Sequence, residues 1–144
     1  MESENGFFRN LEPGMTIQQV KDEEKWILRD EEKDYLFFEQ REKSGEMHTL
    51  ECSFGVQGLM EIKLDSYFIG SAEARSLFNE MKEYYKSRFG ESEDYYGFSG
   101  WITEFDEKTI HIELSDETSE YRQGKISLFI YEYVPEAPKK PSPL

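Results

Sequence analysis

Apolar and polar positions along this chain follow two periods in turn, and the same succession occurs twice. In the first half, Thr16 and Gln19 form a capping box that starts a helix of at most about three turns. The period then changes to two over 35–64, where apolar residues alternate with polar ones. Because turn residues interrupt this alternation at 43–46 and at 55–58, the pattern predicts a helix followed by three antiparallel strands.

The second half begins with the clearest helical pattern of the chain. Apolar residues recur every three or four positions from Ala74 to Tyr85, behind Ser71, which we interpret as the helix cap. Gly90 follows at the left-handed position that ends many helices. Three further strands are predicted, over 101–105, 109–114 and 125–134.

These elements predict a single α+β domain over 1–134, with the order α-βββ-α-βββ. Its two helices pack on one face of an antiparallel sheet of about six strands. The last strand is apolar on both faces, with Phe129, Tyr131 and Tyr133 on one of them, so it should be central or covered. The proline-rich segment 135–144 predicts a disordered tail, because proline has no N–H to contribute to a sheet.

Charge limits the classes of partner. The 144 residues include 31 acidic and 17 basic side chains, and the formal net charge is -14. Nucleic acid and anionic membranes are poor partners for such a chain, because both are bound through Lys and Arg, whereas a basic protein suits it. The single cysteine excludes an internal disulfide, and the chain as written predicts a cytoplasmic location. A leader or lipid anchor that had been removed would leave the same residues.

No group of residues predicts catalysis, a cofactor or a metal. His48 and Cys52 are four positions apart on a predicted strand, about 13 Å, too far to act as a base and nucleophile. His111 lies on the polar face of its strand, and two histidines are too few for a zinc site without distant carboxylates. The acidic run 91–94 lacks the spacing of an EF-hand loop, and 97–100 lacks that of a phosphate loop.

Aromatic residues gather after the second helix, and Tyr and Trp are the types that most often anchor protein interfaces. The candidate partner-binding residues are Tyr95, Tyr96, Phe98 and Trp101 in that region and Tyr131 on the last strand. The face that carries Tyr131 needs cover if the helices lie on the other side of the sheet. A second copy of the chain could supply that cover, so a homodimer is one expectation.

Three short features of the chain resemble a broad bacterial group. They are Gly-Met-Thr-Ile-Gln-Gln-Val at 14–20, Tyr-x-x-x-Phe-Gly at 85–90 and Trp101 before a strand. The group includes β-lactamase-inhibitor-protein-like domains and the small lipoproteins of outer-membrane protein assembly. The resemblance implies helices on one face of an antiparallel sheet, no catalysis, and action by binding other proteins. The lipoproteins' N-terminal lipid-bearing cysteine is missing, since Cys52 lies within a predicted strand, so no membrane anchor is implied.

We therefore predict a non-enzymatic, protein-binding bacterial domain. One alternative is an acidic immunity protein or secretion chaperone that recruits a basic partner, for which association would depend strongly on salt. The other is a hydrolase that uses two of the many carboxylates, which requires a deep pocket and an acid with a raised pKa.

Overall fold

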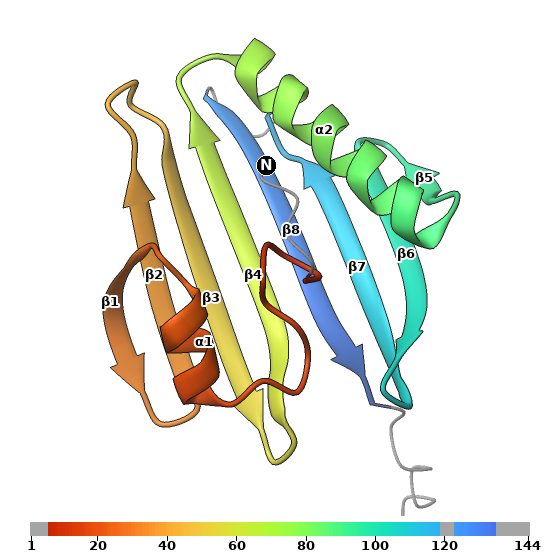
Figure 1. Ribbon diagram of the computed structural model, residues 1–144. Helices are drawn as coiled ribbons and strands as arrows, with labels where there is room; N and C mark the ends of the chain where they lie inside the picture. The colour runs from red at the N-terminus through yellow and green to blue at the C-terminus, as the bar shows by residue number, and fades with distance from the viewer. Residues whose placement is uncertain (1–5, 119–122, 135–144) are drawn as a thin grey trace, which may run out of the picture.

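Figure 1 shows the computed structural model, which describes residues 6–118 and 123–134. Both helices lie on one face of a single antiparallel sheet, so the predicted α+β class is confirmed. The elements in chain order are α1 (Ile17–Glu23), β1 (Ile27–Glu32), β2 (Tyr35–Arg41), β3 (Met47–Gly55), β4 (Gly58–Phe68), α2 (Ser71–Phe89), β5 (Glu93–Tyr95), β6 (Phe98–Phe105), β7 (Lys108–Asp116) and β8 (Gly124–Tyr133). The predicted tail at 135–144 lies outside the described residues.

The sheet has eight strands, in the order β1-β2-β3-β4-β8-β7-β6-β5, rather than about six. Every neighbouring pair is antiparallel, and the pairing of β4 with β8 joins the two halves of the chain. The predicted central position of the last strand is therefore confirmed. Its inward face carries Ile126, Leu128 and Ile130, which are buried, and its other face carries Phe129, Tyr131 and Tyr133.

The two strands that the sequence pattern missed are the edge strands, β1 and β5. Each pairs with one neighbour, β2 or β6 respectively, and each is dominated by exposed acidic residues. An edge strand needs no continuous apolar face, and charge on it discourages pairing with another chain. The acidic run 91–94, whose composition is typical of a loop, therefore contains the start of β5.

The capping box at the start of α1 is confirmed. The Thr16 hydroxyl accepts from the Gln19 backbone N–H at 3.1 Å, and the Gln19 side chain accepts from the Thr16 N–H at 2.9 Å. The helix ends after 7 residues, shorter than the predicted limit. The Glu24 carboxylate accepts from the backbone N–H groups of Lys25 and Trp26 at 3.0 Å each, which turns the chain out of the helix.

Helix α2 begins and ends within a residue of the prediction. Its N-cap is Gly70 rather than Ser71, and no side chain caps it. Gly90 ends the helix as predicted, but at φ 90° and ψ -163°, a positive-φ conformation that is extended in ψ rather than the left-handed helical one expected. The buried residues Ala74, Met81 and Tyr85 face β4, β6, β7 and β8. None of the described helices combines the length and apolar character required to cross a lipid bilayer.

The segment before α1, for which the sequence pattern predicted no element, contributes to the core. Phe7, Phe8 and Leu11 are buried on the helix side of the sheet. The Tyr85 hydroxyl donates to the Phe7 carbonyl oxygen at 2.6 Å, and the Tyr84 hydroxyl donates to that of Gly6 at 2.9 Å. These bonds fasten the segment to α2, beside the gap between the two helices (Figure 1).

Candidate functional site

The face of the sheet away from the helices is the broadest candidate surface. We call it the open face and define it by the strand register. Its central side chains are Tyr35, Phe37 and Glu39 on β2; Thr49, Glu51 and Ser53 on β3; Glu61, Lys63 and Asp65 on β4; Ser127, Phe129, Tyr131 and Tyr133 on β8; Thr109, His111 and Glu113 on β7; and Phe98, Ile102 and Glu104 on β6. No described helix covers it.

Rings on β7 and β8 form a ladder across this face. The ring centroids of Phe129 and Tyr131 are 4.6 Å apart, and His111 lies 5.1 Å from both Tyr131 and Tyr133. The Tyr131 hydroxyl donates to the Glu113 carboxylate at 2.7 Å. Burial and this hydrogen bond raise the pKa of Tyr131 to about 12. Contacts within the protein therefore fix the orientation of the Tyr131 ring.

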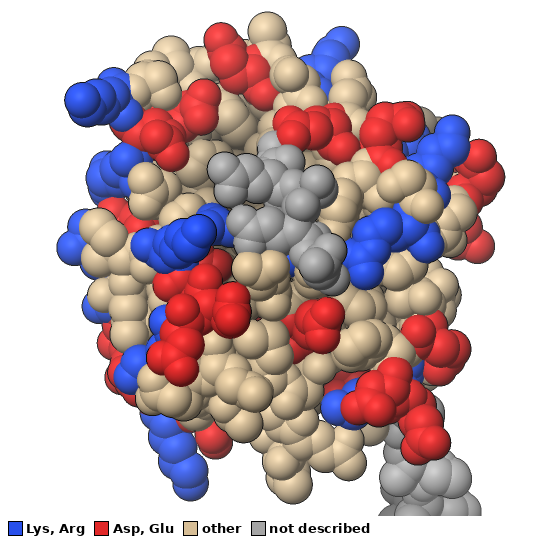
Figure 2. All heavy atoms as spheres, in the orientation of Figure 1, with Lys and Arg blue, Asp and Glu red and all other residues tan. Residues whose placement is uncertain are grey.

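Carboxylates outnumber basic groups on the open face. The acidic side chains at its central positions are Glu39, Glu51, Glu61, Asp65, Glu104 and Glu113, and the basic ones on or beside it are Arg29, Arg41, Lys63 and Lys125. Three of these cations are paired within the protein: Arg29 and Arg41 with Glu39 at 4.0 Å and 2.7 Å, and Lys125 with Glu117 at 2.9 Å. On the helix side, by contrast, Lys/Arg and Asp/Glu groups are interspersed (Figure 2). The open face therefore combines rings with net negative charge.

Of the five candidate residues from the sequence, three share the open face. Tyr95 pairs with Phe98 at the β5–β6 turn, and Phe98 pairs with Ser115 in the same outward row of the sheet. Tyr131 lies further toward the sheet centre on the same face. Tyr96 is fully exposed in the turn itself. Whether any of these residues binds a partner stays a prediction.

Trp101 does not belong to a surface patch. It is 4% exposed, its Nε1–H donates to the Gly90 carbonyl oxygen at 2.9 Å, and its ring packs on Tyr85. Alternation along β6 places Phe98 outward and Trp101 inward.

Near the β5–β6 turn, Asp94 accepts hydrogen bonds from Ser92, Ser99 and Lys82, which lower the pKa of its carboxyl to about 2.

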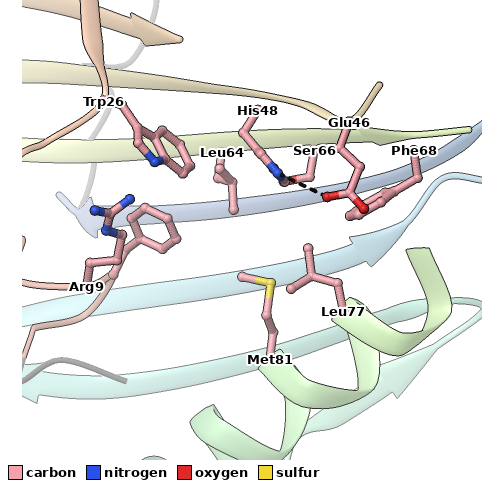
Figure 3. Close-up of a pocket in the computed structure, with 10 residues that line it drawn as sticks. Arg9, Trp26, Glu46, His48, Leu64, Ser66, Phe68, Leu77 and Met81 are labelled. Atoms are coloured by element: carbon pink, nitrogen blue, oxygen red, sulfur yellow. Dashed lines mark hydrogen bonds and ion pairs between the residues drawn. The ribbon is translucent and has the colours of Figure 1, made fainter. Parts of the chain in front are cut away.

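A second candidate, the helix-side pocket, lies between the two helices. It has a volume of about 360 Å³. Its lining residues are Phe8, Arg9, Trp26, Glu46, His48, Leu64, Ser66, Phe68, Leu77 and Met81. They come from the N-terminal segment, the turn after α1, the start of β3, the end of β4 and the middle of α2 (Figure 3). The pocket is mostly apolar, with a few polar groups, which is the usual composition of ligand sites.

His48 is the polar centre of the pocket wall. Its ring stacks on Trp26 at 5.5 Å, and its Nδ1 lies 2.7 Å from the Ser66 hydroxyl. Its Nε2 faces the Glu46 carboxylate at 3.8 Å. Because a carboxylate only accepts, we assign the proton to Nε2, with Ser66 donating to Nδ1. Burial lowers the pKa of His48, against the opposing effect of Glu46.

Arg9 lies at one end of the pocket. Its guanidinium stands 4.9 Å from the Trp26 ring centroid and its Nη1 3.4 Å from the Glu24 carboxylate. The backbone of Arg9 is left-handed, at φ 56°, within a loop closed by the bond from the Gly6 N–H to the Arg9 carbonyl. Such a conformation costs a non-glycine residue about 1–2 kcal/mol. The fold thus holds this side chain over Trp26 in spite of backbone strain.

The pocket geometry favours binding over nucleophilic chemistry. Ser66 is 0% exposed although it contributes to the pocket wall, and its hydroxyl is occupied by the hydrogen bond that fixes the His48 ring. Cys52 is also buried, and burial raises the pKa of its thiol to about 12. Within 6–118 and 123–134, no three His, Cys, Asp or Glu side chains gather closely enough to hold a metal ion.

Sequence reasoning missed most of both surfaces. Alternation correctly placed His111 on the polar face of its strand, and it could also have added Phe37 to the open face. The pocket residues Arg9, Trp26 and Met81 carry no such signal, since they come from the N-terminal segment, the turn after α1 and helix α2 and meet only in the folded chain.

Comparisons of the chain with protein-family models, with curated proteins and with solved structures found no match in any of the three. The resemblance of 14–20 and 85–90 to the bacterial group stays a prediction.

Titration of His48 should make stability depend on pH. The unfolded side chain takes up a proton near pH 6.5, but the folded one does so only at lower pH. Stability is therefore complete above about pH 6.5 and falls as the pH drops toward the folded-state pKa. In urea unfolding between about pH 5 and pH 8, the free energy of unfolding of His48→Gln should depend less steeply on pH than that of the wild type. His111→Gln is the matched control and should retain the wild-type dependence; equal slopes in all three proteins would contradict the assignment.

Proposed function

We propose that the chain is a non-enzymatic protein-binding domain that engages a basic partner through the open face. The observation that carries this proposal is the ordered ladder of Phe129, Tyr131 and His111, set among carboxylates on a sheet face that no described helix covers. Rigid aromatic side chains are the commonest interface anchors, because little side-chain entropy is lost when they are covered.

The charge of the face selects the chemistry of the partner. An arginine side chain can stack on a tyrosine or phenylalanine ring and pair with an adjacent carboxylate at once. Tyr131 with Glu113, and Tyr35 with Glu51, are such pairs, each joined by a hydrogen bond of 2.7 or 2.8 Å. The net charge of -14 also attracts a basic protein over a distance, which raises its association rate. An acidic immunity protein or a secretion chaperone would fit this description.

A second copy of the chain is a weaker candidate for the same face. In a symmetric dimer each open face would meet the carboxylates of the other, including Glu51, Glu61 and Asp65. Like charges brought together in this way oppose association, most strongly at low salt. Light scattering decides the matter: a dimer that Tyr131→Glu converts to monomer would favour self-association over a basic partner.

The experiment uses two matched pairs of variants on an affinity support. Tyr131→Ala removes an open-face ring, and Tyr96→Ala removes a ring from the β5–β6 turn. Glu61→Lys reverses a charge on the open face, and Glu83→Lys makes the same change on the exposed side of α2. Bacterial lysate is passed over each protein at about 50 mM and about 300 mM salt, and the affinity of the most enriched purified protein is then measured.

We expect the retained protein to be basic and its retention to fall at the higher salt. Tyr131→Ala and Glu61→Lys should each weaken its binding by about tenfold or more, while Tyr96→Ala and Glu83→Lys change it by less than about twofold. A partner whose binding is lost with Tyr96→Ala and kept with Tyr131→Ala would overturn the assignment to the open face.

A further inference from the structure

We propose that the helix-side pocket binds a small zwitterion that has a carboxylate at one end, an ammonium group at the other and an apolar body between them. The pocket and the open face lie on opposite sides of the sheet and share no residues. This inference is therefore independent of the proposed protein partner, and either can fail without the other.

The body of the ligand is defined by the walls of the pocket. Figure 3 shows Arg9 and Glu46 at opposite ends, with Leu64, Leu77 and Met81 between them. The thioether of Met81 adapts to ligands of different shape. A volume of about 360 Å³ equals that of about a dozen liquid waters, which is room for a chain of several methylene groups with its two polar ends.

The carboxylate end is defined by Arg9. Its guanidinium is a planar fork that matches the two oxygens of a carboxylate, and its position over Trp26 is fixed by stacking. Among the described residues, Glu24 is the ion-pair partner of Arg9, through Nη1 alone. In the described part of the chain, every buried side-chain nitrogen or oxygen has a hydrogen-bond partner. The guanidinium N–H groups of Arg9 that have no such partner are therefore exposed rather than buried. The strained backbone of Arg9 is typical of residues held in place for binding.

The ammonium end is defined by Glu46. Its carboxylate remains partly exposed at the pocket margin and faces the Nε2 of His48. Because His48 is neutral at pH 7 in this setting, it leaves the charge of Glu46 available to a ligand cation. The hydrogen bond from Ser66 holds the imidazole against Trp26, so the wall beside Glu46 is rigid.

We expect neither a simple anion nor a simple cation to fit the pocket as well as a zwitterion. A lone anion would be opposed by Glu46, by Glu24 and by the net charge of -14. A lone cation would meet the guanidinium of Arg9. A zwitterion that spans the pocket places each charge beside its opposite, and the apolar body covers Leu64 and Met81.

The test uses 6-aminohexanoate as the probe, with hexanoate and hexylamine as probes that each keep one charged end. Binding to the full chain is followed by NMR of the indole N–H groups, because the chain has two tryptophans, Trp26 in the pocket and Trp101 in the core. The Trp26 signal should shift and saturate, and the Trp101 signal should stay in place. We expect 6-aminohexanoate to bind about tenfold more tightly than either control, the usual size of one charged hydrogen bond.

Two variants assign the ends. In Arg9→Gln, 6-aminohexanoate should bind no more tightly than hexylamine. In Glu46→Gln, it should bind no more tightly than hexanoate. Glu42→Gln changes the charge of the same β2–β3 turn outside the pocket. It should leave both differences in affinity unchanged. The proposal is overturned if the Trp26 signal does not move with 6-aminohexanoate, or if the wild-type protein binds all three probes equally. These wild-type comparisons stand even if a variant fails to fold.

Discussion

Replacing Gly58 by alanine should lower the free energy of unfolding by about 3–4 kcal/mol. Gly58 follows the β3–β4 turn at φ 94°, a conformation that L side chains rarely adopt. A Cβ added there would overlap the carbonyl carbon and oxygen of Gly14 and lie 2.8 Å from the carbonyl oxygen of Met15. These are backbone atoms, so no side-chain rotation can relieve the overlap.

The overlap would separate the N-terminal segment from the sheet. The Gly14 N–H donates to the Leu59 carbonyl, and the Leu59 N–H donates to the Met15 carbonyl, each at 2.8 Å. Both bonds hold the start of α1 against the β3–β4 hairpin, and they must lengthen if the chains move apart. The loss of buried hydrogen bonds therefore adds to the strain at Gly58 itself.

Gly90→Ala is the matched control for this prediction. Gly90 also has a positive φ, of 90°, but an added Cβ meets nothing within 4 Å. Only the backbone strain of a conformation with φ 90° and ψ -163° remains, about 1–3 kcal/mol. Urea unfolding of the two variants separates strain from overlap, and equal losses of stability would show that contact with Gly14 does not matter.

The elements that sequence patterns predicted are those that must bury one face. Helix α2 and the strands β2, β3, β4, β7 and β8 each place alternate or periodic side chains in the core, so their apolar residues recur at the period of the element. The edge strands β1 and β5 bury almost nothing, and their acidic residues gave the pattern of a loop. The segment 6–11 was missed for the opposite reason, since its few apolar residues are buried without any period.

The sequence predicted part of the open face but none of the helix-side pocket. Alternation along β8 correctly separated Tyr131 from Ile130, because pairing with β4 and β7 on both sides fixes the register. Along β6, the same rule places Trp101 inward, whereas the density of rings in that region favoured an interface. The pocket depends on how α2 and the N-terminal segment pack together, which no local pattern encodes.

Tyr85→Ala should lower the free energy of unfolding by about 3–5 kcal/mol, the usual cost of emptying a large aromatic site. Tyr85 is fully buried and packs on Phe89 and Trp101. Tyr85→Phe keeps the ring but removes the hydroxyl that donates to the Phe7 carbonyl oxygen at 2.6 Å. That carbonyl then loses a buried hydrogen bond, which should cost about 1–3 kcal/mol in thermal or urea unfolding.

Tyr84→Phe is the control, and it distinguishes anchoring of the segment from general packing. The Tyr84 hydroxyl donates to the Gly6 carbonyl oxygen, but Arg88 Nη1 donates to the same oxygen, so the carbonyl keeps a partner. The loss should therefore stay below about 1 kcal/mol. Because Phe7 directly precedes two residues that line the helix-side pocket, Tyr85→Phe should also broaden the Trp26 indole signal, while Tyr84→Phe leaves it sharp. An unchanged signal in Tyr85→Phe would mean that the segment is held in place by its buried apolar side chains alone.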